Sequence, residues 1–271
     1  MIEHNIDTLY VCGCSFTRMC SKIKDGVQHP DVSDQWPQLL ANKLKIPNVV
    51  NDALWNGNNA RTFRKLEEFL RTTDVDPEKI FVIIQFTFPW RFEMWTDMEH
   101  DDYSWSESPI RENWARLNPG WAKIEEPFQA DAHDWSVAIN PPKKDDPDHD
   151  KIKQLIYQGR IKAYGKAVDW NPETEYQTLM RDCLAIDNIL NLYNVKRRYC
   201  FGDEANSKVT KRLIKLVPGF LKNLVFMNVI PNELKTIDNY HADALGNIHL
   251  ADLLYDELHD NLTEKTVQNY Q

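Results

Sequence analysis

A single hydroxyl group stands in a turn of small residues near the start of the chain. The apolar run at residues 8–12 is typical of a short buried strand, and it leads directly into Gly13, Cys14 and Ser15. Open parallel sheets bind their ligands at the carboxyl ends of the strands, so Ser15 is placed where a nucleophile could act. That chemistry also needs a base, an orienting carboxylate and an oxyanion site. The simpler alternative is that Ser15 caps the segment that follows it.

The base and the carboxylate are found more than two hundred positions later. Asp238 stands three residues before His241, where a loop meets a predicted closing helix at 244–261. The carboxylate can hold one imidazole nitrogen while the other faces the serine. The order Ser, Asp, His is one of the known chain orders for this triad. Alternatively, His241 is an ordinary residue of a helix N-terminus and Asp238 is a loop-side cap.

The elements that must position these groups alternate along the chain. Residues 7–89 show apolar, strand-like runs separated by helical periods, which implies right-handed crossovers and a parallel sheet. We therefore predict a flavodoxin-like, doubly wound α/β fold with three layers (α/β/α). The predicted strands are 8–12, 49–51, 79–86 and 198–201, and the predicted helices begin near residues 34, 59 and 174 and at 244. Residues 18–30 are predicted to be a loop, and Phe63, Leu66 and Leu70 to be the buried stripe of the second helix.

The middle of the chain departs from this alternation. Residues 88–173 hold seven of the nine tryptophans, and residues 97–150 hold 14 Asp/Glu against 5 Lys/Arg, which accounts for the whole net charge of −9. The aromatic content argues against disorder. We predict one domain over residues 1–271, with an irregular inserted cap or subdomain at about 90–173. Packing of a small cap and a sugar-stacking surface are both open as explanations for the tryptophans.

Three short blocks resemble those of the SGNH (GDSL-type) hydrolases. Residues 13–17 (Gly-Cys-Ser-Phe-Thr) resemble the first block, Gly-Asp-Ser-x-Thr/Leu, and residues 51–59, which end in Gly-Asn-Asn, resemble the second. Residues 238–246, with Asp-x-x-His and a later glycine, are similar to the fifth block. The third block, Gly-x-Asn-Asp, has no match at residues 85–88. The resemblance covers residues 8–89 and 235–258, and divergent SGNH-like proteins of bacteriophages are the relatives it suggests.

The resemblance implies a serine esterase that works through an acyl-enzyme. Ser15 would be the nucleophile, His241 the general base and Asp238 its orienting carboxylate. The implied substrates are acyl or acetyl esters, as small molecules or on carbohydrate. No cofactor and no metal are expected.

The resemblance also implies an oxyanion site. The N–H groups of Ser15 and Gly57 would hold the oxyanion, with Asn58 or Thr87 as a side-chain donor. Thr87 stands where the family has its oxyanion asparagine, and loss of one such donor costs about 10²–10³ in rate. Gly57 serving only a turn, and Thr87 only ending a strand, are the simpler alternatives.

Composition limits the other classes of function. The acidic chain, with a pI near 5.4, argues against a nucleic-acid-binding surface. Five cysteines at these spacings fit neither a disulfide framework nor a metal cluster, so reduced thiols are expected. No signal peptide and no apolar span long enough for a bilayer are evident. We expect no membrane partner and a location in the cytoplasm of the producing cell or in a virion.

Two further functions stay open at this point. One is a catalytically weak or inactive SGNH-fold protein that has a structural or binding role, for example in a virus particle, with protein assembly through the insertion. The missing third block and the bulky insertion favour it. The other, nucleotide binding, is weakened because the turn after the first strand lacks Gly-x-Gly-x-x-Gly.

Overall fold

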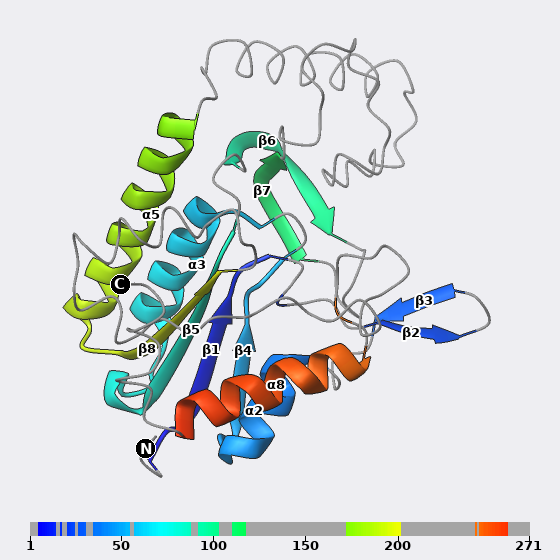
Figure 1. The fold of residues 1–271 in the computed structure, drawn as a ribbon. Coiled ribbons are helices and arrows are strands. Elements are labelled where there is room, and N and C mark those ends of the chain that lie inside the picture. The colour runs from blue at the N-terminus through cyan, green and yellow to red at the C-terminus, as the bar shows by residue number, and fades with distance from the viewer. Residues whose placement is uncertain are drawn as a thin grey trace.

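The centre of the molecule is a parallel sheet of four strands, ordered β4-β1-β5-β8 (Figure 1). The computed structural model describes residues 5–14, 17, 21–24, 27–30, 35–54, 57–87, 92–102, 110–117, 172–201, 242 and 244–259. The strands are β1 (Thr8–Cys12), β4 (Asn48–Asn51), β5 (Ile80–Phe86) and β8 (Lys196–Phe201). The order runs second, first, third, fourth, as in flavodoxin-like sheets. The predicted α/β fold with a doubly wound parallel sheet is confirmed.

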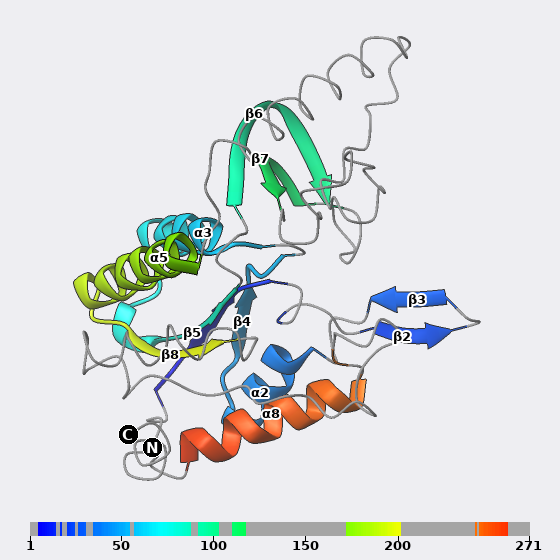
Figure 2. The ribbon, with the colours of Figure 1, turned by 45° about the horizontal axis from the view of Figure 1, so that its top comes forward.

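Helices cover both faces of this sheet (Figures 1 and 2). One layer holds α2 (Trp36–Leu44) and α8 (Ala244–His259), which pack against each other, and the other holds α3 (Asn59–Thr72) and α5 (Pro172–Leu192). A short 3-10 turn, η1 (Pro77–Lys79), leads into β5. The three predicted layers are therefore present.

Strand β5 shows why a continuous apolar run marks a central strand. All seven of its residues are buried, and alternate side chains enter different cores. Phe81 and Ile83 pack in the layer of α2 and α8, whereas Ile80, Val82 and Ile84 pack in the layer of α3 and α5. A strand covered on both faces has no solvent side, so its sequence does not alternate.

The helices begin and end close to the predicted residues. Helix α2 ends at Leu44 because Lys45 adopts a left-handed conformation with φ of 58°, two residues before Pro47. In α3 the predicted stripe is partly wrong, since Leu66 and Leu70 are buried but Phe63 is 36% exposed. The buried face of α3 is centred on Thr62, Leu66 and Leu70, which leaves Phe63 at its margin.

Two antiparallel hairpins correct the sequence-based expectations. The predicted loop at 18–30 contains β2 (Ser21–Lys24) paired with β3 (Val27–Pro30). The two residues between them are Asp-Gly, a pair typical of tight hairpin turns. The insertion, predicted to be irregular, contains β6 (Phe92–Asp102) paired with β7 (Ile110–Leu117), beyond the carboxyl ends of the parallel strands (Figure 1). A register shift between Trp95 and His100 interrupts the period of β6.

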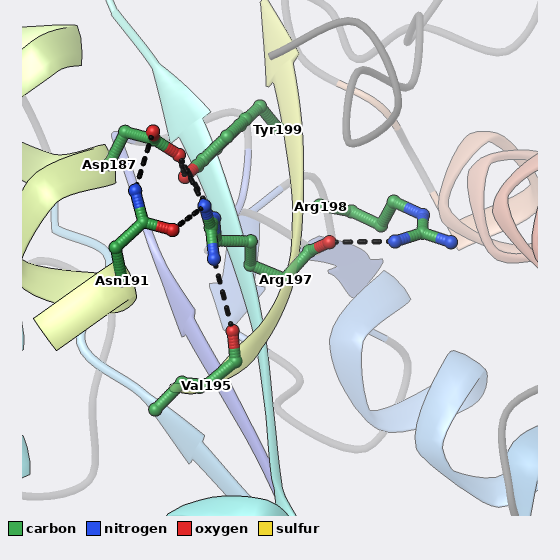
Figure 3. Close-up of polar contacts among 6 residues, drawn as sticks. All are labelled: Asp187, Asn191, Val195, Arg197, Arg198 and Tyr199. Carbon is green, nitrogen blue, oxygen red and sulfur yellow. Dashed lines mark hydrogen bonds and ion pairs between the residues drawn. The ribbon is translucent and has the colours of Figure 1, made fainter. Parts of the chain in front are cut away.

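A buried polar cluster fastens α5 to β8 (Figure 3). The carboxylate of Asp187 accepts hydrogen bonds from Arg197 at 2.8 and 3.0 Å, from the Tyr199 hydroxyl at 2.6 Å and from Asn191 at 3.1 Å. The side chains of Asp187 and Arg197 are only 10% and 14% exposed. Burial, reinforced by the hydrogen bond to Asp187, raises the pKa of Tyr199, so the phenol stays a donor. The cluster lies within the α5 layer and is structural.

We predict that Arg197→Met lowers the free energy of unfolding by about 3–5 kcal/mol, because it leaves a buried carboxylate without its cation. The matched control is Arg71→Met, which removes an exposed ion pair with Glu67 and should cost less than about 1 kcal/mol. Urea denaturation followed by tryptophan fluorescence measures both. Equal losses in the two variants would contradict this account of the cluster.

Candidate active site

The carboxyl ends of β1, β4 and β5 are surrounded by side-chain amides. Open parallel sheets bind ligands at this edge, and the predicted nucleophile turn begins here at Gly13. The amide-bearing residues near this edge with exposures of 4% or less are Gln35, Asn58, Asn59, Gln85 and Asn247. A buried amide is costly unless it is hydrogen-bonded, so the partners of each one show what it holds in place.

Two glycines bring the end of β1 against the start of α3. A Cβ atom added at Gly57 would lie 2.3 Å from the carbonyl oxygen of Gly13 and 3.0 Å from that of Leu54. A Cβ atom added at Gly13 would meet Gln85 at 2.8 Å and the Thr17 hydroxyl at 2.9 Å. Only glycine allows these approaches. The turn that carries the predicted nucleophile therefore begins in backbone contact with the segment that leads into α3.

Asn58 caps α3 and keeps one donor group unused. Its Oδ1 accepts the backbone N–H of Arg61 at 2.8 Å, which fixes the orientation of the amide. Within the described part of the chain, its Nδ2 is one of the buried polar atoms without a hydrogen-bond partner. The N-terminus of a helix also carries a partial positive charge. An unpaired donor and a positive helix end thus coincide beside Gly13.

Gln85 is the polar residue inside the apolar run of β5. Its Oε1 accepts from the backbone N–H of Cys14 at 3.4 Å, from the Cys14 thiol at 3.6 Å and from the Thr17 hydroxyl at 2.5 Å. The backbone N–H of Thr17 donates to the carbonyl of Cys14 at 3.0 Å. The amide of Gln85 therefore contacts both sides of the turn at 14–17.

Asn59 locks the end of β5 to the start of α3. Its Oδ1 accepts the backbone N–H of Thr87 at 2.9 Å, and its Nδ2 donates to the Thr87 carbonyl at 3.2 Å. The pair of bonds imitates one rung of a sheet. It holds Thr87, which is 3% exposed, against the first turn of α3.

Asn247 joins the segment after His241 to the first half of the chain. Its Oδ1 accepts the backbone N–H of Trp36 at 2.9 Å, and its Nδ2 donates to the carbonyl of Ala242 at 3.3 Å. Ala242 is buried in the same core as Trp36 and the β1 residue Val11. Ala242, which follows the predicted base His241 in the chain, therefore lies in the same core as β1, the strand that leads to Ser15.

The Cys12 thiol at this edge is not poised to act as a nucleophile. Burial raises the pKa of the Cys12 thiol to about 11, with the Arg61 guanidinium acting in the opposite direction. The thiol is therefore protonated at neutral pH, and the thiolate is the reactive form. Cys12, Cys14, Cys183 and Cys200 are all buried, and no disulfide joins any two of these described cysteines. No group of three or more His, Cys, Asp or Glu that could hold a metal occurs among the described residues.

The predicted site residues divide into two sets. Ser15, Asp238 and His241 lie outside the described residues, so the triad stays a prediction. Gly57 and Asn58 lie beside Gly13, and the N–H of Gly57 donates to the Leu54 carbonyl at 2.8 Å. An oxyanion role for Gly57 therefore requires that this N–H be shared or released.

The carboxyl edge of the sheet also holds Thr87 and three residues that the sequence did not single out. Thr87 is held through its backbone by Asn59. Sequence reasoning did not single out Gln85, Thr17 or Asn59. For Gln85 a signal was present, because a lone amide in the run Ile-Phe-Val-Ile-Ile-Gln-Phe must have a reason to be buried. Asn59 and Thr17 gave no comparable signal, since polar residues are ordinary in turns and caps.

Comparisons with known proteins add little to this geometry. No known protein family matches the sequence, and neither does any curated protein. Among solved structures, the chain is similar to the psychrotrophic esterase EstA from a Pseudoalteromonas species, inhibited by monoethylphosphonate, at 10% identity and a TM-score of 0.48 over 97% of this chain and 99% of that one. It is also similar to a proposed arylesterase from Agrobacterium tumefaciens, at 13% identity and a TM-score of 0.45 over 95% and 100%. Both scores are too low to derive a family or an activity from them.

The length and hydropathy of the helices show whether any of them could span a membrane. Among the described residues, none forms a helix that is both long and apolar enough to cross a bilayer.

We predict that Gly57→Ala destabilises the protein more than Gly13→Ala. The new Cβ at position 57 meets a backbone oxygen at 2.3 Å, whereas its nearest contact at position 13 is longer, 2.8 Å to the Cβ of Gln85. The other two contacts at position 13, with the Gln85 Oε1 and the Thr17 hydroxyl at 2.9 Å, are with side-chain ends that can shift. Overpacking typically costs about 1–3 kcal/mol, so Gly13→Ala should fall in that range and Gly57→Ala at or above its upper end. Urea denaturation of both variants measures the difference. A smaller loss for Gly57→Ala would show that the two segments are not in fixed contact.

Proposed function

We propose that this protein is a serine hydrolase of the SGNH type that cleaves acyl or acetyl esters through an acyl-enzyme. The observation that carries the proposal is the contact between Gly13 and Gly57. It sets the start of the Ser15 turn against a helix N-terminus, where the Asn58 amide has a donor without a partner among the residues that the structure describes. Preorganised donors beside a nucleophile are what acyl transfer needs.

In the proposed reaction the Ser15 hydroxyl attacks the ester carbonyl while His241 takes its proton. Asp238 holds the imidazole in the required tautomer and stabilises its protonated form. His241 then gives the proton to the leaving alcohol, and a water molecule activated by the same base releases the acid. Ser15 is regenerated, and no cofactor enters any step.

The negative charge that develops on the carbonyl oxygen is stabilised by hydrogen-bond donors near the N-terminus of α3. The Asn58 Nδ2 group is fixed in orientation by its capping bond, and the partial positive charge of the α3 N-terminus adds to it. The backbone N–H groups of Ser15 and Gly57 are the further donors that the family resemblance implies. Thr87 is the weaker candidate because it replaces an amide donor with a hydroxyl.

The substrate side of the proposal is an ester of a small molecule or a glycan. Hydrolysis of p-nitrophenyl acetate reports the acyl-transfer step without a commitment to the natural alcohol. Assembly with other proteins through the insertion, and a location in a virion or in the cytoplasm of the producing cell, belong to the same proposal.

We predict that Ser15→Ala and His241→Ala each abolish hydrolysis of p-nitrophenyl acetate and leave the unfolding transition in place. The matched control is His249→Ala, because His249 lies on α8 and is half-buried. That variant should keep wild-type turnover. A fluorophosphonate probe should label the wild type at Ser15 and fail to label Ser15→Ala.

The second candidate function is that of a structural or binding protein with a hydrolase fold. The engaged N–H of Gly57 and the threonine at position 87 favour this alternative. Wild-type protein that neither turns over the ester nor reacts with the probe would contradict the hydrolase proposal and favour this alternative. Turnover that persists in Ser15→Ala would contradict the assigned nucleophile.

A second prediction isolates the Asn58 donor. Asn58→Ser keeps a good helix cap but removes the Nδ2 donor, so kcat should fall by about 10²-fold while the free energy of unfolding changes by less than about 1 kcal/mol. Asn58→Asp also keeps the cap, but it places a negative charge beside the developing oxyanion, and it should lose at least as much. Wild-type kcat in Asn58→Ser would remove this residue from the oxyanion site.

A further inference from the structure

Gln85 lowers the stability of the folded protein at the position it occupies. It is 1% exposed, and its Nε2 is one of four buried side-chain polar atoms without a hydrogen-bond partner within the described part of the chain. A buried donor without a hydrogen bond destabilises the folded state. A methionine would fill a similar volume without that cost, so the retained amide calls for an explanation.

The explanation lies on the oxygen side of the amide. Oε1 accepts from the Cys14 backbone, the Cys14 thiol and the Thr17 hydroxyl. The accepted backbone N–H fixes which end of the amide is oxygen. These contacts stand on the two sides of Ser15 in the chain, and Gly13 lies so close that any Cβ there would strike Gln85.

The direction of the side chain adds to this. Along β5, Phe81 and Ile83 enter the layer of α2 and α8, and the two-residue period of a strand puts Gln85 on the same face. Ala242, the residue after His241, is buried in that layer. Gln85 therefore contacts Cys14 and Thr17 from the face of the sheet on which Ala242 is buried.

We propose that Gln85 is the positioning residue of the nucleophile, holding the Ser15 turn in register with the base through its Oε1. The inference rests on the proposed function and deepens it. A nucleophile displaced by about 1 Å can lose about 10²-fold in rate. Because one buried acceptor binds the residues on both sides of Ser15, its loss is expected to lower the rate of acylation. The residue acts through the turn and need not touch the substrate.

The test uses variants that remove the acceptor or one of its donors. Gln85→Met removes the acceptor at similar length, and Thr17→Val removes one donor, whereas Thr17→Ser keeps the hydroxyl. Gln177→Met is the matched control, because it removes an exposed amide contact with Glu173 on α5. Two measurements are made on the full chain: hydrogen exchange of the Cys14 and Thr17 amides, and the rate of fluorophosphonate labelling at Ser15.

The expected result is a coupled change in both measurements. Gln85→Met should speed exchange at Cys14 by at least about tenfold and slow labelling by about 10- to 100-fold, with KM for the ester little changed. Thr17→Val should move both measurements in the same direction, and Thr17→Ser should restore them. Gln177→Met should change neither. If Gln85→Met does not fold, the Thr17 pair alone decides.

Two results would overturn the inference in distinguishable ways. If Ser15 is labelled in the wild type at a rate that Gln85→Met and Thr17→Val do not change, Gln85 is merely structural and the proposed function stands. If Ser15 in the wild type is not labelled at all, the proposed function fails, and the positioning role fails with it.

Discussion

The contact between the backbones of Gly13 and Gly57 is the constraint on which the rest of the site depends. It is a contact between main chains, so no side chain can adjust to relieve it, and it requires glycine at position 57, where a Cβ atom would lie 2.3 Å from the carbonyl oxygen of Gly13. The parallel pairing of β1 with β4 and β5 sets the level at which the two glycines meet. The capping bond of Asn58 and the double bond of Asn59 then fix the first turn of α3 relative to this point.

The residues that carry amide groups at this edge are almost completely buried. Most amide groups there bind backbone partners, as with Asn59 and Asn247. Over the described ranges of the chain, the amides of Asn58 and Gln85 each have one donor without a partner. Polar groups in a region of low dielectric interact more strongly than they do in water. Buried polar groups are normally hydrogen-bonded, so a buried donor without a partner calls for a functional explanation. For this reason the edge, and not the Asp187 cluster on α5, is the candidate for chemistry.

Much of the architecture could be predicted from the sequence because the strongest signals are local. The run at Ile80–Phe86 and the period of α5 each report burial directly. The β2–β3 hairpin was missed because its strands are short and polar, although Asp-Gly between them is a turn signal. The β6–β7 hairpin was missed because a register shift breaks its alternation.

The site was less predictable than the fold for a physical reason. The family resemblance singled out Gly57 and Asn58, because a glycine-containing turn before a helix is a local pattern, and their oxyanion roles stay predictions. It could not show that Gln85 faces Cys14 and Thr17, because that contact depends on which strands are neighbours and how they are aligned. The N–H of Gly57 bonded to Leu54 is likewise a property of the folded turn and not of its composition.

The bond between Trp36 and Asn247 has a consequence for how the molecule comes into being on the ribosome. Helix α2 is among the first segments to be synthesised, yet the acceptor for its opening N–H belongs to α8, 211 positions later. Domains tend to fold as units during synthesis, and contacts so distant along the chain form slowly. A nascent polypeptide that has not yet produced α8 therefore holds an unfinished edge, so any reactivity at Ser15 should arise only late in translation.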